Sequence, residues 1–165
     1  MKTLYIIRHA KSSWSFEVSD RDRPLGIRGR RDAPRVGKHL SQTEPTPELM
    51  ISSPASRALY TALLMGDEWG YPEDEIELSE KLYHTGPSEI INLIKEQSDE
   101  IQSIALFGHN PGLTDLVNHF STDYLDNLPT AGVYCFTFKT DSWTKISENN
   151  ASKKVFIAPK RLSKN

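Results

Sequence analysis

The chain has 165 residues, and its 20 lysines and arginines against 22 aspartates and glutamates give a formal net charge of -2. This length suits a single globular domain with one core, so we expect one domain over residues 1–165. The balanced charge excludes the broad basic surface that is typical of nucleic-acid binding. We therefore expect no nucleic-acid partner and only a local site for any anion.

Short apolar runs rich in β-branched residues alternate with longer segments of helical spacing. The predicted strands are residues 4–7, 49–52, 104–107, 133–138 and 155–158, and the predicted helices are residues 25–40, 55–69, 89–97 and 114–120. This alternation predicts an α/β fold, a three-layer α/β/α sandwich with a mostly parallel central sheet. The last two strands leave little room for a crossover helix between them, so we expect them to form an antiparallel edge.

The first predicted strand ends in an arginine and a histidine. In "TLYIIRHAKSSW" four apolar residues lead directly into Arg8 and His9. These side chains are well suited to meet a phosphate, and open α/β sheets bind ligands at the carboxyl ends of their strands. Taken alone, the pair has a plainer interpretation, which is a strand that turns polar where it reaches solvent.

Two later junctions between a strand and a helix carry similar residues. In "ISSPASR" a serine hydroxyl and Pro54 are expected to begin a helix, which puts Arg57 in or near its first turn. In "FGHNPGL" the strand stops before His109, and Asn110 and Pro111 are expected to begin the next helix. Because the carboxyl ends of parallel strands meet at one edge of a sheet, we expect these cationic groups to converge there.

Arg8, His9, Arg57 and His109 would then form a cluster that needs an anion. Their mutual repulsion lowers the pKa values of the histidines and is unfavourable unless an anion compensates it. A phosphoryl group fits best, because guanidinium groups match its oxygens and stabilise the charge that develops in phosphoryl transfer. An imidazole kept neutral by its arginine neighbours can attack phosphorus. We therefore expect His9 to be the nucleophile and to form a phosphohistidine intermediate.

The motifs "RHAKSSW", "RPLGIRGRRDAPRVGKHL", "SSPASRALYTA" and "GHNPGLTDL", in this order, resemble the histidine phosphatase superfamily, whose fold is phosphoglycerate mutase-like. In size and motif sequence the chain is similar to the small SixA-type phosphohistidine phosphatases. The resemblance implies that Arg8, His9, Arg57 and His109 are the catalytic and phosphate-binding residues. Ala10 stands where many relatives have glycine, which is tolerable if its φ is negative. The long insertions that cap the site in larger relatives are absent, which implies an open, shallow site.

The residue that protonates the leaving group is less constrained by these motifs. Larger members of the family use a carboxylate from a Leu-x-Glu segment after the third strand, and "LSEKLY" places Glu80 at that position. Asp20 and Asp22, in the polar loop before Arg23, are alternatives, although such residues also make turns beside proline. An imidazole leaving group departs readily once it is protonated, so a strong protein acid is unnecessary if the substrate is a phosphohistidine.

We expect the site to act on a phosphohistidine in a protein, with a small phosphomonoester as the alternative substrate. Without a cap, a small metabolite has little surface to contact, whereas a protein can use a polar rim of Lys11, Ser12 and Arg23. Lys11 and Arg23 would attract acidic surfaces. A non-catalytic domain that binds phosphoproteins is the other alternative, but a binder has no chemical need for His9. We expect no cofactor and no metal ion.

Other conspicuous residues are expected to have structural roles. Three histidines lack a carboxylate or cysteine at a metal-ligand spacing, so they are assigned to the surface or the core. They are His39, His84 and His119. A run of arginines on the first helix is assigned to a solvated face. It consists of Arg28, Arg30 and Arg31. Cys135 is expected to be a packing residue in an apolar edge strand.

The compartment is predicted from cysteine usage and from apolar segments. A single cysteine excludes an internal disulfide, and no apolar run is long enough to span a bilayer. No signal-peptide pattern precedes the first predicted strand. We therefore expect a cytoplasmic monomer without a membrane partner.

Overall fold

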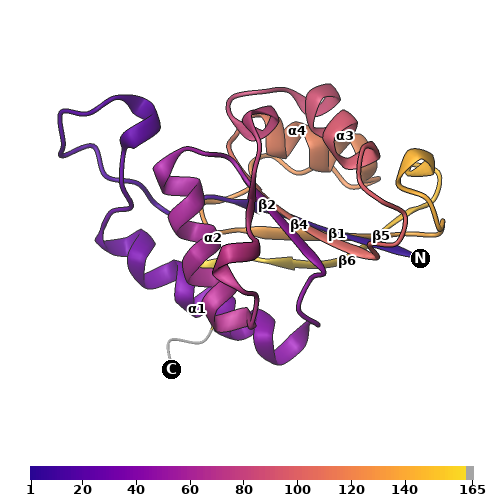
Figure 1. Cartoon of the computed structure of the whole chain (residues 1–165), viewed down its shortest axis with the longest axis horizontal. Coiled ribbons are helices and arrows are strands. Elements are labelled where there is room, and N and C mark those ends of the chain that lie inside the picture. The colour runs from indigo at the N-terminus through magenta and orange to yellow at the C-terminus, as the bar shows by residue number, and fades with distance from the viewer. Residues whose placement is uncertain (163–165) are drawn as a thin grey trace.

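A six-stranded sheet with helices on both faces forms the centre of the fold (Figure 1). The computed structural model describes residues 1–162, so the last part of the predicted domain, residues 163–165, lies outside the described residues. The strands are β1 (Lys2–Arg8), β2 (Leu49–Ser52), β3 (Glu77–Leu78), β4 (Ser103–Gly108), β5 (Val133–Phe138) and β6 (Ala151–Ile157). Their spatial order is β3-β2-β4-β1-β5-β6.

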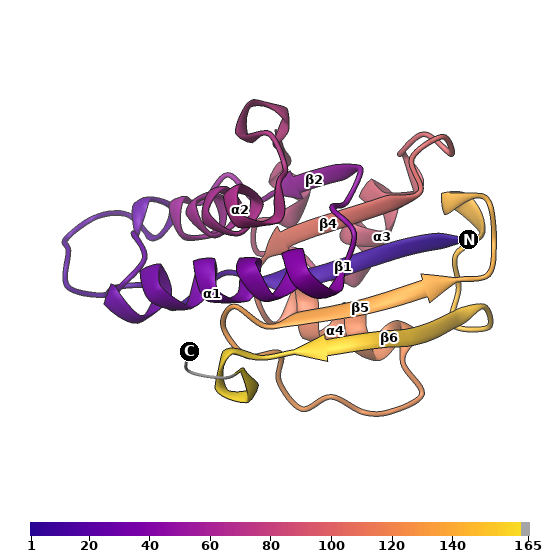
Figure 2. The ribbon, with the colours of Figure 1, turned by 90° about the horizontal axis from the view of Figure 1, so that it is seen from below.

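The strand directions confirm the predicted sheet. Strands β1 to β4 run parallel, whereas β5 pairs antiparallel with β1 and β6 pairs antiparallel with β5 (Figure 2). Across β1 and β4 the register pairs Arg8 with Gly108. The residues that follow, His9 and His109, therefore leave the sheet side by side at its carboxyl edge.

Four helices complete the predicted three layers. They are α1 (Ile27–Thr43), α2 (Ser56–Trp69), α3 (Pro87–Lys95) and α4 (Gly112–Phe120). Helices α1 and α2 cover one face of the sheet, and α3 and α4 cover the other (Figure 1). Side chains of β1 alternate between the two layers, as the pleat requires. Leu4 and Ile6 lie in the cluster beneath α3 and α4. Tyr5 and Ile7 lie in the cluster beneath α1 and α2.

None of the helices within residues 1–162 combines the length and the apolar character of a bilayer-spanning segment.

Three features of the sheet differ from the sequence-based prediction. Strand β3 was not predicted, because both of its residues are exposed and no apolar run marks it. Strand β6 begins at Ala151, earlier than expected, since its first half is largely exposed. Strand β5 lies between β1 and β6, so Cys135 is not in an edge strand. The Cys135 side chain is fully buried, in agreement with a packing role, and burial raises the pKa of its thiol to about 12.

The starts of the two helices that follow the site differ from the prediction. The first helical residues are Ser56 in α2 and Gly112 in α4, so Pro54 and Pro111 precede their helices. Asn110 still acts as a cap, because its Oδ1 accepts hydrogen bonds from the backbone N and the hydroxyl of Thr114 at 3.2 and 2.9 Å. The capping function was predicted correctly, and the error concerns the residue at which the helix starts.

Candidate active site

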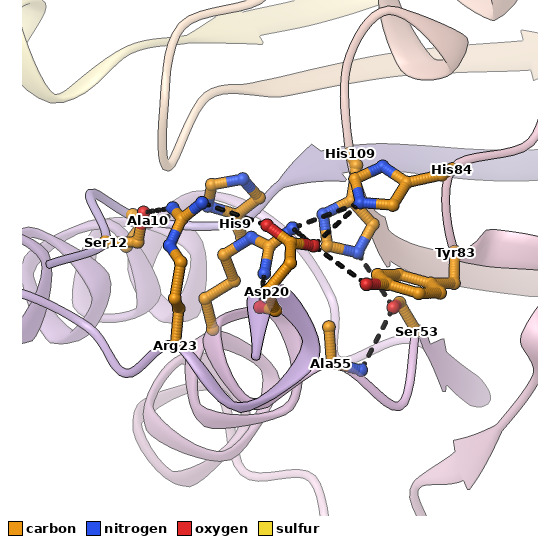
Figure 3. Close-up of polar contacts among 11 residues, drawn as sticks. His9, Ala10, Ser12, Asp20, Arg23, Ser53, Ala55, Tyr83, His84 and His109 are labelled. Carbon is orange, nitrogen blue, oxygen red and sulfur yellow. Dashed lines mark hydrogen bonds and ion pairs between the residues drawn. The ribbon is translucent and has the colours of Figure 1, made fainter. Parts of the chain in front are cut away.

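His9 and His109 are neighbours at the carboxyl edge of the parallel strands (Figure 3). Their ring centroids are 5.2 Å apart, and only 7% and 4% of the two residues is exposed. The backbone N of His9 donates to Gly108 O at 3.1 Å, which extends the pairing of β1 and β4 by one residue. The charges of Arg8 and Arg57 act on His9, so all four residues of the predicted cluster lie together.

The orientation of the His9 ring is fixed by a hydrogen bond to the backbone. Its Nδ1 lies 2.7 Å from Ala10 O, and a carbonyl oxygen can only accept. The proton of the neutral ring is therefore on Nδ1, and Nε2 carries the lone pair. The backbone of Ala10 is itself held in place, because the N of Ala10 donates to Thr61 Oγ1 at 2.9 Å. The φ of Ala10 is not positive, so alanine is tolerated there, as the sequence analysis required.

Arg57 lies in the first turn of α2 and contacts a carboxylate from another part of the chain. Its Nη1 donates to Asp20 O at 2.6 Å and its Nη2 donates to Asp20 Oδ2 at 3.0 Å. Asp20 begins the short 3-10 helix η1 (Asp20–Asp22) in the loop between β1 and α1. Both terminal nitrogens of the guanidinium therefore bind one aspartate.

The Asp20 carboxylate is surrounded by donors. Its Oδ2 also accepts from Tyr83 Oη at 2.8 Å and lies 2.9 Å from His84 Nε2, and its Oδ1 accepts from Arg23 Nη1 at 3.0 Å (Figure 3). The hydrogen bond with His84, followed by those with Tyr83 and Arg57, holds the pKa of Asp20 well below its usual value. We expected a bound anion to supply the compensating charge. Asp20 supplies part of it from within the chain.

The loop that carries Asp20 is closed at its base. Ser12 and Leu25 form an antiparallel bridge across it. The backbone N of Gly26 donates to Lys11 O at 2.9 Å. A Cβ atom at Gly29, in the first turn of α1, would collide with Lys11 O, so only glycine permits this close approach. Together these contacts hold the ends of the loop and direct its tip towards Arg57.

Burial is the main reason why both histidines are neutral. It lowers the pKa of His9 to about 3, with smaller contributions from the charges of Arg57 and Arg8, while the bond to Ala10 O opposes the shift. Burial, followed by the charges of His9 and Arg57, lowers the pKa of His109 to about 2. Charge repulsion alone predicts the same direction, but desolvation is the larger cause.

Three buried nitrogens within residues 1–162 have no hydrogen-bond partner, and all three belong to this cluster. They are Arg8 Nε, Arg23 Nε and His109 Nδ1. An unpaired buried polar group costs about 1 to 3 kcal/mol. Each of these side chains has another nitrogen that is engaged: Arg8 Nη1 donates to Leu128 O at 3.0 Å, Arg23 Nη1 donates to Asp20 Oδ1 at 3.0 Å, and His109 Nε2 lies 2.8 Å from Ser53 Oγ. The arrangement suits an oxyanion with several acceptor oxygens.

Only one of the three residues predicted to form a polar rim is exposed. Lys11 is exposed, but Arg23 and Ser12 are buried, at 7% and 9% exposure. Arg23 donates to Ser12 Oγ, and its guanidinium lies 3.3 Å from the centroid of the Trp14 ring. The charge of Arg23 also acts on His9. Arg23 is therefore a member of the cationic cluster, because the loop folds it inward.

The carboxylate predicted as the proton donor is paired with an arginine at the surface. Glu80 is in the 3-10 helix η3 (Glu80–Leu82), and its exposed carboxylate pairs with Arg21. That pairing lowers the pKa of Glu80, so the group is held ionised. Its hydrogen bonds within residues 1–162 go to Arg21. Of the two alternatives, Asp22 accepts from the Ser19 hydroxyl at 3.0 Å, and Asp20 lies in the cluster. Asp20 is thus the one of these three carboxylates that contacts Arg57 and His84, although its lowered pKa keeps it ionised as well.

Sequence reasoning missed two residues, Tyr83 and His84. The His84 ring lies 5.0 Å from that of His109 and 4.3 Å from that of Tyr83. His84 was assigned to the surface or the core. It lies after β3 and the 3-10 helix η3, and because β3 was not predicted, His84 could not be placed at the carboxyl edge of the sheet. The backbone at Thr85, next to His84, packs closely on the start of α4. A Cβ atom at Gly112 would collide with Thr85 O. His84 itself has a φ of 51°.

Comparison with known proteins defines the family. A model of the histidine phosphatase superfamily (branch 1) matches residues 4–89, and the chain belongs to this family. The uncharacterized protein Rv1276c of Mycobacterium tuberculosis is 31% identical over 105 residues, which cover 64% of this chain and 63% of the relative. The chain thus spans less than two thirds of the length of that relative. The uncharacterized protein ML1117 of Mycobacterium leprae is 28% identical over 93% of this chain and 100% of its own length.

Solved structures share the fold. A protein assigned as phosphohistidine phosphatase SixA from Agrobacterium tumefaciens superposes with a TM-score of 0.81 at 25% identity, over 96% of this chain and 98% of that chain. The protein histidine phosphatase SixA complexed with tungstate gives 0.78 at 21% identity, over 98% and 99%. The mycobacterial glucosyl-3-phosphoglycerate phosphatase gives 0.68 at 16% identity, over 94% and 98%. The fold is therefore SixA-type and phosphoglycerate mutase-like.

The buried neutral state of His109 predicts a loss of stability in acid. Its pKa in the folded chain lies below the ordinary 6.5, so the unfolded chain binds the proton first and stability falls as the pH drops below about 6.5. Between pH 7 and pH 5 the wild-type protein should lose about 1 to 2 kcal/mol more unfolding free energy than His109→Asn. Urea unfolding at the two pH values measures this difference.

The matched control is His119→Asn, a change on the exposed face of α4. It should keep the pH dependence of the wild-type protein. Equal acid sensitivity of the wild-type protein and His109→Asn would contradict the assignment of a buried neutral imidazole.

Proposed function

We propose that the chain is a phosphatase that forms a covalent phosphoryl intermediate on His9, and that it removes phosphate from phosphohistidine side chains of proteins. The observation that carries the proposal is the His9 ring, whose Nδ1 is held by Ala10 O. This bond leaves Nε2 as a neutral nitrogen with a lone pair, beside the guanidinium groups of Arg8 and Arg57. A neutral nucleophile next to fixed positive charge is the combination that attack on a phosphoryl group requires.

The reaction then has two steps. In the first, His9 Nε2 forms a bond to phosphorus while the bond from phosphorus to the substrate nitrogen breaks, and the leaving imidazole takes up a proton. In the second, water attacks the phosphoryl group on His9, which releases inorganic phosphate and restores the neutral ring. Arg8 and Arg57 stabilise the phosphoryl oxygens in both steps.

His109 would act as a further donor to the phosphoryl oxygens. Ser53 Oγ accepts from the backbone N of Ala55 at 3.2 Å, so its hydroxyl proton is available to His109 Nε2. In that arrangement the proton of the His109 ring lies on Nδ1, the nitrogen without a partner. A neutral imidazole with a free N–H donates a hydrogen bond without adding charge to the site.

The pair of His84 and Asp20 is our candidate for the proton supply, in place of Glu80. An imidazole hydrogen-bonded to an ionised carboxylate can hold a proton and release it to a leaving group. The His84 ring is half-exposed and faces His109, whereas Glu80 is engaged by Arg21. The positive φ of His84 is a strained conformation of the kind that clusters at functional sites.

Two features support a protein substrate. Structures of SixA-type proteins share the fold over nearly the whole chain, and the long insertions of larger family members are absent from the sequence. A small phosphomonoester is the second candidate, because the mycobacterial glucosyl-3-phosphoglycerate phosphatase also shares the fold. A site that only binds phosphoproteins is disfavoured, since binding alone does not require a histidine with a free Nε2.

The covalent intermediate gives the first test of this function. Rapid quenching of turnover with a phosphohistidine peptide should leave phosphate on the tryptic peptide that contains His9, in a linkage that is labile to acid and stable to base. Mass spectrometry of the quenched protein locates the label. His109→Gln should slow turnover but keep the label on His9, and His9→Ala should carry none.

A label on His109, Ser12 or Ser13 would contradict the assignment of the nucleophile. Turnover by His9→Ala at the rate of the wild-type protein would contradict the covalent mechanism altogether.

The proton supply is tested by comparing leaving groups. An alkyl phosphate needs a proton on its leaving oxygen, whereas p-nitrophenyl phosphate does not. His84→Gln should therefore lower kcat/KM about 100-fold for the alkyl phosphate and less than about 10-fold for p-nitrophenyl phosphate. Glu80→Gln, the matched control, should stay within about 3-fold of the wild-type protein for both substrates.

The opposite pattern would overturn this assignment. A loss in Glu80→Gln that depends on the leaving group, together with an unaffected His84→Gln, would identify Glu80 as the acid.

A further inference from the structure

A groove of about 970 Å³ lies outside the site, between α1, the loop that precedes β5 and the chain after β6. Its apolar lining residues include Leu125, Pro129, Phe156 and Leu162, and the guanidinium of Arg161 lies 4.7 Å from the centroid of the Phe156 ring. Basic side chains from α1 and from the 3-10 helix η5 (Pro159–Arg161) stand around it. The arginine run of α1 is exposed, as expected for a solvated face. Two of its members, Arg28 and Arg31, also line the groove, whereas Arg30 does not.

The groove is locally cationic, although the whole chain has a net charge of -2. Its basic members are Arg28, Arg31, Arg35, Lys160 and Arg161, and its acidic members are Asp32 and Asp126. The buried carboxylate of Asp32 pairs with three of the arginines, at 3.8, 3.5 and 3.1 Å. Arg28 and Arg31 share this carboxylate, and one carboxylate cannot neutralise two guanidinium groups, so positive charge remains on this wall.

One loop separates the groove from the candidate active site. Leu128 O accepts from Arg8 Nη1 at 3.0 Å, and the backbone N of Ala131 donates to His9 O at 3.0 Å. Between them, Thr130 Oγ1 accepts from Arg28 Nη2 at 3.4 Å and faces the groove. The start of α1 and the end of β6 also lie at the same end of the sheet as the carboxyl end of β1 (Figure 2).

We infer that this groove binds an acidic segment of the protein substrate, next to the phosphohistidine in its sequence or on its surface. Carboxylates of that segment would pair with Arg31 and Lys160. Its apolar side chains would lie against the apolar lining residues of the groove, such as Leu125. The inference rests on the proposed function, because it names the kind of protein that the site accepts. In this inference, charged residues of the groove, outside the phosphoryl site, determine which protein substrate is preferred.

Two phosphohistidine peptides of equal length test the inference, one with Leu and Glu beside the phosphohistidine and one with Leu and Lys. The wild-type protein should show a higher kcat/KM for the acidic peptide, and the preference should weaken as salt rises. The double variant Arg31→Gln/Lys160→Gln should lower kcat/KM for the acidic peptide roughly 3- to 10-fold and leave p-nitrophenyl phosphate hydrolysis unchanged. Arg30→Gln, a neighbour outside the groove, should behave as the wild-type protein.

Binding of the same peptides with a stable phosphohistidine analogue, measured by fluorescence anisotropy, separates this inference from the proposed function. If the wild-type protein hydrolyses no phosphate ester or phosphohistidine but still binds the acidic peptide through Arg31 and Lys160, the proposed function fails and the groove assignment stands. Equal binding and turnover of both peptides, or a preference that the double variant retains, would overturn the groove assignment.

Other occupants of the groove give distinct results. If only a variant that lacks residues 163–165 prefers the acidic peptide, the chain covers its own groove and the inference is wrong. A concentration-dependent dimer that the double variant abolishes would assign the groove to a second copy of the chain and would equally contradict the inference.

Discussion

The parallel pairing of β1 with β4 is the constraint on which the candidate site depends. It places Arg8 opposite Gly108, so the next residue of each strand is a histidine at the same edge of the sheet. A shift by one residue would move Leu4 and Ile6 into the opposite layer, where the cavities are shaped for Tyr5 and Ile7. The register of this seven-residue strand thus places the two imidazole rings side by side.

The site follows from the cost of burying charge at this edge. Two histidines remain neutral there, while Arg8, Arg23 and Arg57 bring positive charge that burial would otherwise make unfavourable. Asp20 compensates part of that charge through the tip of the loop before α1. Asp20 engages both terminal nitrogens of Arg57, so in the proposed reaction an incoming phosphoryl group would share this guanidinium with the carboxylate. The Asp20 loop would then belong to the proposed binding site as much as the strand ends do.

Sequence patterns were sufficient for the buried part of the fold and of the site. Apolar runs identify β1, β2, β4 and β5, and the polar residues directly after three of these strands, with Arg57 in the following helix, are the ones that meet. The exposed parts could not be predicted in the same way. Glu77 and Leu78 leave no hydrophobic signal for β3, so His84 was not recognised at the carboxyl edge.

The hydrophobic periodicity of the sequence does not reveal the contacts that charged side chains make within a folded loop. Arg23 was predicted on a rim and is buried, because its partners Ser12 and Asp20 come from elsewhere in the same loop. Glu80 is predicted as the proton donor from a short motif, and its pairing with Arg21 depends on how the loop before α1 folds. Both cases concern charged side chains whose partners are set by tertiary structure.

The central claim is that His9 is a neutral imidazole with its proton on Nδ1 and a free lone pair on Nε2. Long-range ¹H–¹⁵N correlation spectra of the protein labelled with ¹⁵N-histidine, assigned by comparison with His9→Ala, report the protonation of each ring nitrogen. At pH 6 the account predicts a protonated Nδ1 and an unprotonated Nε2 for His9. A proton on Nε2, or an imidazolium at that pH, would contradict it.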